Sequence, residues 1–132
     1  MIVADSNLIA SCVLESSTTE AARHLRASDN EWYVPTLWRY EVTNILATMI
    51  RVRGLPSETA ISIFDALSES LKPYERDPSA DDVFALVSDY GITGYDAQFV
   101  ALAQELHCTL YTQDKEILAK FPTLAKPFYR KR

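Results

Sequence analysis

Ile2-Val3-Ala4-Asp5-Ser6-Asn7 is the stretch that decides the fold, because its three apolar residues are followed directly by three polar ones. A buried strand that stops at its carboxyl end has this pattern. A second run of this kind is Thr109-Leu110-Tyr111, followed by Thr112-Gln113-Asp114. The sequence therefore predicts two short buried strands, each with an aspartate close behind it.

Helical patterns and turn residues fill the chain around these two strands. We expect a strand at Trp32-Tyr33-Val34, closed by Pro35. Residues 72–75 carry a weak strand signal. An edge strand is expected through Phe128 and Tyr129, in the tail that runs from Lys126 to Arg132. Apolar spacing and capping residues predict helices over residues 18–27, 37–53, 56–71, 79–91, 93–106 and 114–120. Thr36 is the expected N-cap of the long second helix and Gly54 its C-terminal stop.

Strands that alternate with helices indicate a parallel sheet with right-handed crossovers and helices on its faces. The predicted fold class is α/β: a three-layer domain with a central parallel β-sheet of four to five strands flanked by helices, formed as one domain by residues 1–132. In open sheets of this kind, sites form beyond the carboxyl ends of the strands.

Composition restricts the environment and the partners. With 48% hydrophobic and 23% charged residues, the chain resembles an ordinary soluble domain, and no apolar stretch approaches the ~18 residues that span a bilayer. No secretory leader is expected, and Cys12 and Cys108 are expected to be reduced thiols, which favours the cytoplasm. The net charge is −5, but with four of the 18 acids set aside at a metal site, 14 face 13 basic residues. Net charge therefore does not exclude a nucleic-acid substrate.

Four acids occupy positions from which they can converge. Asp5 and Asp114 follow strands, and Glu41 and Asp96 lie in the first turns of helices that begin near the same sheet edge. Like-charged carboxylates ~4 Å apart repel by on the order of 4 kcal/mol at an effective dielectric of ~20, so a cluster needs protons or divalent cations. Oxygen ligands without His or Cys favour Mg²⁺ or Mn²⁺ over Zn²⁺.

Each acid also has a purely structural explanation. Asp5 fits the end of a strand, and Glu41 fits a solvated helix position. Asp96 completes a capping-box pattern with Thr93, and Asp114 is placed to cap the last helix. Spacing alone leaves these alternatives open.

Nearly the whole length of the chain resembles PIN-domain ribonucleases, and specifically the VapC-type toxins of type II toxin–antitoxin systems. Four segments carry the resemblance, and they occur in order along the chain. They are Val3-Ala4-Asp5-Ser6-Asn7, the Pro35–Leu46 segment PTLWRYEVTNIL, Tyr95-Asp96-Ala97 with Leu102-Ala103, and Leu110-Tyr111-Thr112-Gln113-Asp114. One departure is His107-Cys108, where a glycine often closes the helix.

This resemblance implies a metal-dependent endoribonuclease that leaves 5′-phosphate and 3′-hydroxyl ends. It implies that the metal ligands, direct or through water, are Asp5, Glu41, Asp96 and Asp114. It further implies that Thr112 holds a carboxylate in place, with Asn7 and Asn44 as less certain neighbours of the acids. The cofactor is expected to be Mg²⁺, with Mn²⁺ able to substitute.

Two other functions stay in view. A haloacid-dehalogenase-like phosphatase also carries an aspartate after its first strand, but needs a second one where this chain has Asn7. A degenerate PIN domain would act only as an RNA-binding or protein-assembly module, although such members usually lose at least one of the acids.

The expected partners are RNA, a cognate VapB-like antitoxin and a second copy of the chain in a homodimer. The apolar helices over residues 37–53 and 56–71 offer a surface for an antitoxin or a second copy, unless they only pack on each other and on the sheet. Basic side chains are candidates for contacts with the RNA backbone; they are Arg39, Arg51, Arg53, Arg130, Lys131 and Arg132.

Overall fold

A four-stranded, fully parallel sheet with the order β2-β1-β3-β4 forms the centre of the computed structural model, which describes residues 1–131. The strands are β1 (Ile2–Ala4), β2 (Trp32–Tyr33), β3 (Thr109–Tyr111) and β4 (Ala125–Lys126). Ile2 pairs with Trp32 on one side and with Thr109 on the other. The predicted α/β class with a parallel sheet is confirmed.

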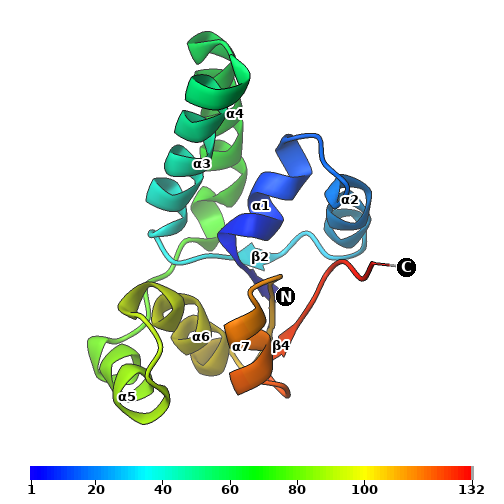
Figure 1. Cartoon of the computed structure of the whole chain (residues 1–132). Helices are drawn as coiled ribbons and strands as arrows, with labels where there is room; N and C mark the ends of the chain where they lie inside the picture. The colour runs from blue at the N-terminus through cyan, green and yellow to red at the C-terminus, as the bar shows by residue number, and fades with distance from the viewer. Residues whose placement is uncertain (132) are drawn as a thin grey trace.

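Helices lie against both faces of this sheet (Figure 1). They are α1 (Ser6–Val13), α2 (Thr19–Ser28), α3 (Trp38–Arg53), α4 (Ser57–Leu71), α5 (Ala80–Tyr90), α6 (Gly94–Leu106) and α7 (Lys115–Lys120), with a short 3-10 helix at Lys72–Tyr74. In Figure 1, α3 and α4 form a hairpin that projects from the body, while α5 and α6 pack together at its base. Within residues 1–131, no helix combines the length and the apolar character needed to cross a membrane.

The protein has two hydrophobic cores, one on each face of the sheet, and the alternation of side chains along β1 explains why. Successive strand residues point to opposite faces of a sheet. Val3 is buried with residues of α5, α6 and α7, whereas Ile2 and Ala4 are buried with residues of α1 to α4. The apolar residues of β1 thus contribute to the hydrophobic cores on both faces of the sheet.

Local signals placed most helix ends correctly. Gly54 and Gly91 adopt left-handed conformations after α3 and α5, with φ of 69° and 66°. Ser79 accepts a hydrogen bond from the Asp82 N–H at the start of α5. His107, which stands where a glycine was expected, also adopts the left-handed conformation (φ 52°) and ends α6.

Several details differ from the predictions. The weak strand signal over residues 72–75 falls on the 3-10 helix at Lys72–Tyr74, and only Glu75 forms an isolated bridge, with Val34. Helix α1 was not predicted; it begins immediately after β1, with Asp5 as its N-cap. Thr36 does not cap α3; its N–H and hydroxyl both donate to the Asp77 carboxylate, a partner 41 residues away. The edge strand is β4, so Phe128 and Tyr129 lie beyond it, and the last residue of the predicted tail, Arg132, lies outside the described residues.

The carboxyl ends of β1 and β3 lie side by side. Ala4 pairs with Tyr111, and the Asp5 N–H donates to the Tyr111 carbonyl oxygen at 3.1 Å. Because the two strands are neighbours, the polar residues that follow them come together at one edge of the sheet.

Candidate active site

Asp5 lies where β1 ends and α1 begins. It is the N-cap of α1, and its Oδ1 accepts a hydrogen bond of 2.7 Å from the Ser6 N–H. Only 8% of the residue is exposed, although its side chain is a carboxylate. Asp5 therefore has a defined orientation and little contact with water.

Thr112 fixes the other oxygen of this carboxylate. Its fully buried hydroxyl donates to Asp5 Oδ2 at 2.5 Å and accepts a hydrogen bond from the Asp114 N–H at 3.0 Å. Asn7 lies beside both groups, with its Nδ2 at 3.5 Å from Asp5 Oδ2 and from Thr112 Oγ1. The side-chain oxygen Oδ1 of Asn7 accepts from the Gln113 N–H at 3.4 Å. The polar residues after β1 and after β3 thus form one hydrogen-bonded network.

Glu41 enters the site from the first turn of α3. Its Oε1 accepts a hydrogen bond of 2.8 Å from the Ser6 hydroxyl. Ser6 is buried and 35 residues away in sequence, so this contact ties α3 to α1. The Glu41 side chain is half-buried and hydrogen-bonded, so Glu41 is not an ordinary solvated helix residue.

Asp96 lies in the first turn of α6, and Thr93 is the N-cap of that helix. The bond between them joins the Asp96 N–H to Thr93 Oγ1 at 3.1 Å. The backbone of Asp96 therefore takes part in capping, while its carboxylate lines the pocket described below.

Asp114 is both a helix cap and an acid of the pocket. It is the N-cap of α7, where its Oδ1 accepts from the Ile117 N–H at 2.9 Å. Its other carboxylate oxygen has no hydrogen-bond donor in the described part of the chain. One oxygen holds the helix, and the other is free to face the pocket.

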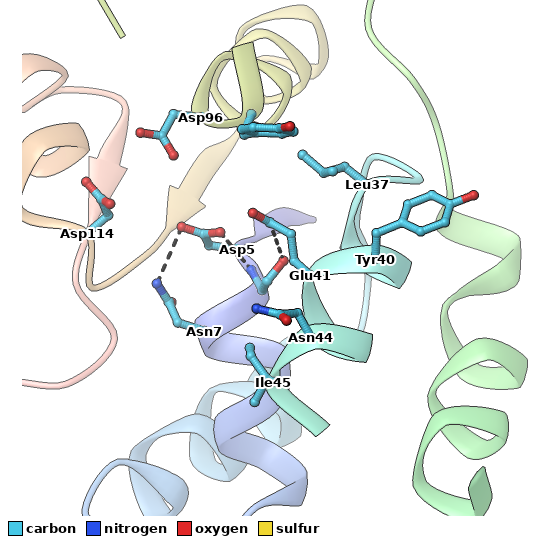
Figure 2. Close-up of a pocket in the computed structure, with 11 residues that line it drawn as sticks. Asp5, Asn7, Leu37, Tyr40, Glu41, Asn44, Ile45, Asp96 and Asp114 are labelled. Atoms are coloured by element: carbon cyan, nitrogen blue, oxygen red, sulfur yellow. Dashed lines mark hydrogen bonds between the residues drawn. The ribbon is translucent and has the colours of Figure 1, made fainter. Parts of the chain in front are cut away.

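All four carboxylates line one open pocket with a volume of about 560 Å³ (Figure 2). In Figure 2 the four carboxyl groups point toward a common space, with Asp5 at its centre. The remaining lining residues are Ser6, Asn7, Leu37, Tyr40, Asn44, Ile45 and Tyr95. No Lys, Arg or His is among them, so no side chain of the pocket neutralises the acids.

Burial and mutual repulsion act on Asp5. Burial raises its pKa to about 6, and the charges of Glu41 and Asp114 raise it as well. Hydrogen bonds from Thr112 and Ser6 lower the pKa by stabilising the ionised form, but do not offset the burial. A raised value in a pocket without basic groups marks a carboxylate that lacks a counter-charge.

The same causes act on two other acids of the pocket. The pKa of Asp96 is raised to about 6, mainly by burial and next by the negative charges of Asp114 and Asp5. Burial also raises the pKa of Glu41, and the charge of Asp96 adds to this effect. Strongly perturbed carboxyl groups that share a cleft are typical of functional sites.

The donor atoms of the pocket suit a hard divalent cation. One carboxylate oxygen each of Glu41 and Asp114 has no hydrogen-bond donor from residues 1–131, Asp96 lines the same pocket, and no sulfur or imidazole lies among the lining groups. No three Asp, Glu, His or Cys side chains in that part of the chain stand close enough to hold one ion directly. Mg²⁺ usually binds through one or two carboxylates and keeps several waters, so the wider spacing of the acids fits such an ion.

The predicted neighbours of the acids differ in their contacts. Thr112 and Asn7 both contact Asp5, whereas Asn44 lines the pocket from α3 without a side-chain hydrogen bond to another described residue. Sequence reasoning missed the hydroxyl of Ser6 as the partner of Glu41, and it also missed two exposed tyrosines at the pocket. No local pattern could have revealed the first contact, because it joins distant segments.

Comparison with known proteins agrees with this architecture. A family model described as PIN domain matches residues 3–126. Ribonuclease VapC3 of Pyrobaculum aerophilum is 32% identical over 129 residues, which cover 96% of this chain and 98% of that protein. Exonuclease VapC9 of the same organism is 33% identical over 81 residues, which cover 61% of this chain and 60% of that protein.

A solved structure shares the fold at much lower sequence identity. It is a toxin–antitoxin complex from Klebsiella pneumoniae, which superimposes with a TM-score of 0.74 at 16% identity and covers 99% of this chain and 100% of that chain. Together with the family match and the curated relative that extends over nearly the whole length, this similarity leads to one conclusion: the chain belongs to the PIN-domain family.

Proposed function

We propose that this protein is a metal-dependent endoribonuclease and acts as the toxin of a toxin–antitoxin pair. The observation that carries the proposal is the single pocket lined by Asp5, Glu41, Asp96 and Asp114 without any basic residue. Membership of the PIN-domain family and the similarity to Ribonuclease VapC3 support RNA as the substrate. We further propose that residues 1–132 form one domain, since β1 and β4 come from opposite ends of the chain and belong to the same sheet.

In this proposal Mg²⁺ occupies the pocket, Mn²⁺ can replace it, and the four acids hold it directly or through water. A bound divalent ion lowers the pKa of a water ligand and stabilises negative charge on a phosphate. The protein contributes fixed carboxylates: Thr112 and Asn7 hold Asp5, and Ser6 holds Glu41. The acids also exclude a bare phosphate by repulsion, so RNA binding in the pocket depends on the ion.

The pocket offers no free serine, cysteine, lysine or histidine as a nucleophile. The Ser6 hydroxyl is buried and already donates to Glu41, and no Cys, Lys or His lines the pocket. Attack by water is therefore the proposed route, and we expect products with 5′-phosphate and 3′-hydroxyl ends.

The direct test is incubation of the purified protein with linear and circular RNA in Mg²⁺, in Mn²⁺ and in EDTA. We expect both RNAs to be cut when either metal is present and neither to be cut in EDTA. Cutting of linear RNA alone would assign an exonuclease activity, as in the name of Exonuclease VapC9. RNA binding without cleavage in any metal would favour the degenerate PIN domain and overturn the proposal.

Two variants and a matched control assign the cleavage to this pocket. Asp5→Asn and Asp96→Asn are expected to abolish cleavage while circular dichroism shows a retained fold. Asp89→Asn is the control, because Asp89 is an exposed acid of α5 that lies outside the pocket. Full metal-dependent activity in both pocket variants would remove these two acids from the proposed site.

The proposed partners are a VapB-like antitoxin and a second copy of this chain, in the cytoplasm. The Klebsiella pneumoniae structure is a complex of a toxin with its antitoxin, which supports the first partner. The projecting α3–α4 hairpin exposes three aliphatic side chains for such contacts, namely Ile50, Val52 and Ile61. Co-expression with a VapB-like antitoxin should relieve growth arrest, and light scattering of the purified toxin should give the mass of a dimer.

The basic side chains differ in their freedom to contact RNA. Arg39 is half-buried and donates two hydrogen bonds to Glu75, so it is unsuited to that role. Arg51, Arg53 and the pair Arg130-Lys131 are exposed and stay candidates. Arg132 lies beyond the part of the chain that the structure describes.

A further inference from the structure

Two exposed tyrosines lie directly beside acids of the active site. Tyr40 precedes Glu41 on α3, and Tyr95 precedes Asp96 on α6. Both line the acid pocket, and both also line a second cavity of about 530 Å³. Because Leu37 is shared as well, the two cavities form one continuous surface, and in Figure 2 the ring of Tyr40 extends away from the acids.

The second cavity is a groove between α3, α5 and α6 with an aromatic wall. Tyr40 is 72% exposed, Tyr95 is 66% exposed, and Phe84 of α5, which also lines the groove, is 69% exposed. None of the three rings stacks on another aromatic ring or on a cation within residues 1–131. Three ring faces next to the acids are thus available to a ligand.

The polar groups of the groove favour a neutral ligand over a phosphate. No Lys or Arg lines it, and its one acid, Asp77, accepts hydrogen bonds from Thr36. The amide of Gln98 lines the groove and has no hydrogen-bond partner among the described residues. An amide offers one acceptor and two donors, which is what pairing with the edge of a nucleobase requires.

We propose that this groove binds an unpaired base of the substrate RNA, in contact with the rings of Tyr95 and Phe84 and with the amide of Gln98, while the adjoining phosphate lies over the acid pocket. The inference rests on the proposed nuclease function and adds a base-binding subsite to it. Single-stranded RNA is commonly recognised by stacking of splayed bases on aromatic side chains. A base inside a duplex would first have to leave its stack, so the enzyme prefers single-stranded regions.

A peptide of the antitoxin is the other conceivable occupant, and the structure favours RNA. The groove is continuous with the acid pocket through Leu37, Tyr40 and Tyr95, so a polynucleotide with a phosphate at the acids extends into it. Its large exposed apolar side chains are all aromatic, whereas the large exposed aliphatic ones, Ile50, Val52 and Ile61, lie elsewhere on α3 and α4.

The test compares a short unstructured RNA with the same RNA carrying an abasic ribose at single positions around the cleaved bond. Cleavage by the wild type is expected to slow at one such position, with a rise in KM of roughly tenfold or more, the size of a lost stacking contact. Tyr95→Ala and Phe84→Ala should raise KM for the normal RNA by a similar factor and lose the discrimination against the abasic one. Tyr95→Phe and Tyr40→Phe keep the rings and should behave as the wild type.

Phe84→Leu separates stacking from general apolar contact. Leucine fills space but has no aromatic face, so we expect it to behave as alanine does. Equal KM values for the wild type, Tyr95→Ala and Phe84→Ala on RNA that the wild type cuts would overturn the subsite and leave the nuclease function intact. Loss of antitoxin binding with unchanged RNA kinetics would assign the groove to a peptide and overturn it too.

Failure of the nuclease function itself is detected separately. If the wild type cuts no RNA in any metal, binding of the same fluorescent RNA is measured by anisotropy with the wild type and the alanine variants. Weaker binding by Tyr95→Ala and Phe84→Ala, with abasic RNA bound equally by all proteins, would support the groove as a base-binding site. Equal binding of normal RNA by all of them would overturn it.

Discussion

The Thr112 hydroxyl donates to Asp5 Oδ2 at 2.5 Å and, on its other side, accepts from the Asp114 N–H at 3.0 Å. One buried oxygen atom thus sets the positions of two acids that are 109 residues apart (114 − 5). Groups that orient metal-binding carboxylates usually affect metal affinity or activity by about 10–100-fold.

Thr112→Val should therefore lower the cleavage rate by about 10–100-fold and raise the Mg²⁺ concentration needed for half-maximal activity. Valine matches the shape of threonine but removes the shortest hydrogen bond to Asp5 Oδ2 and the acceptor of the Asp114 N–H. The free energy of unfolding should fall by about 1–3 kcal/mol for the same reason. Initial rates across a Mg²⁺ titration and urea denaturation measure the two effects.

Thr109→Val is the matched control, because Thr109 lies on β3, just before Thr112 in the chain, and makes no side-chain hydrogen bond with a described residue. Its Mg²⁺ dependence should equal that of the wild type, and Thr112→Ser should retain most activity. If Thr112→Val showed wild-type rates and metal affinity, the hydroxyl would have no part in placing the acids.

Asp114 allows its structural and chemical contributions to be separated. Its Oδ1 caps α7, and asparagine caps a helix about as well as aspartate. Asp114→Asn should therefore keep the melting temperature close to that of the wild type and lose most metal-dependent cleavage. Asp114→Ala should lose cleavage and also about 1 kcal/mol of stability through the missing cap. Normal cleavage by Asp114→Asn would show that the acid serves only as a cap.

The sequence was informative wherever the signal is local. The step from apolar to polar residues after β1 and β3 is visible in a few residues, and so are the caps Ser79 and Thr93 and the stop at Gly54. These features depend on backbone groups within one turn, so a short segment contains all of the relevant physics.

Long-range contacts explain what could not be predicted. Ser6 donates to Glu41 across 35 residues, and Thr36 donates to Asp77 across 41, which turned an expected cap into a tertiary contact. Helix α1 is set largely by its place after Asp5 and by burial of Leu8 and Ile9. The gathering of four acids depends likewise on β1 lying beside β3, which no single segment encodes.

His107 offers a test of backbone strain away from the pocket. Its left-handed conformation costs a residue with a side chain about 1–2 kcal/mol, which glycine does not pay, although glycine loses more entropy on folding. His107→Gly should therefore stabilise the protein by about 0.5–1 kcal/mol and raise its melting temperature by a few degrees, with unchanged cleavage. Gly91→Ala, at φ 66°, is the opposite control and should lower the melting temperature. A lower melting temperature for His107→Gly would show that its side chain stabilises the turn.

The crowded acids predict how stability depends on pH when no divalent metal is bound. The folded-state pKa of Asp5 is about 6, above its ordinary value of 3.8, so the folded protein binds its proton more tightly than the unfolded chain does. The contribution of Asp5 to the free energy of unfolding is therefore fully present below about pH 4. It is lost as the pH rises through about 6. The loss of stability due to Asp5 is on the order of 2–3 kcal/mol. Asp96, whose pKa is also about 6, is more exposed and adds a smaller loss.

Divalent metal should reverse this trend, because the ion binds the ionised carboxylates and only the folded state assembles them. In urea denaturation at pH 5 and pH 8, we expect EDTA-treated protein to be less stable at pH 8, and Mg²⁺ to restore more stability at pH 8 than at pH 5. Asp5→Asn should flatten the pH dependence in EDTA, whereas Asp89→Asn should leave it unchanged. An equal gain from Mg²⁺ at both pH values, or the same gain in Asp5→Asn as in the wild type, would mean that the ion stabilises the protein somewhere other than this pocket.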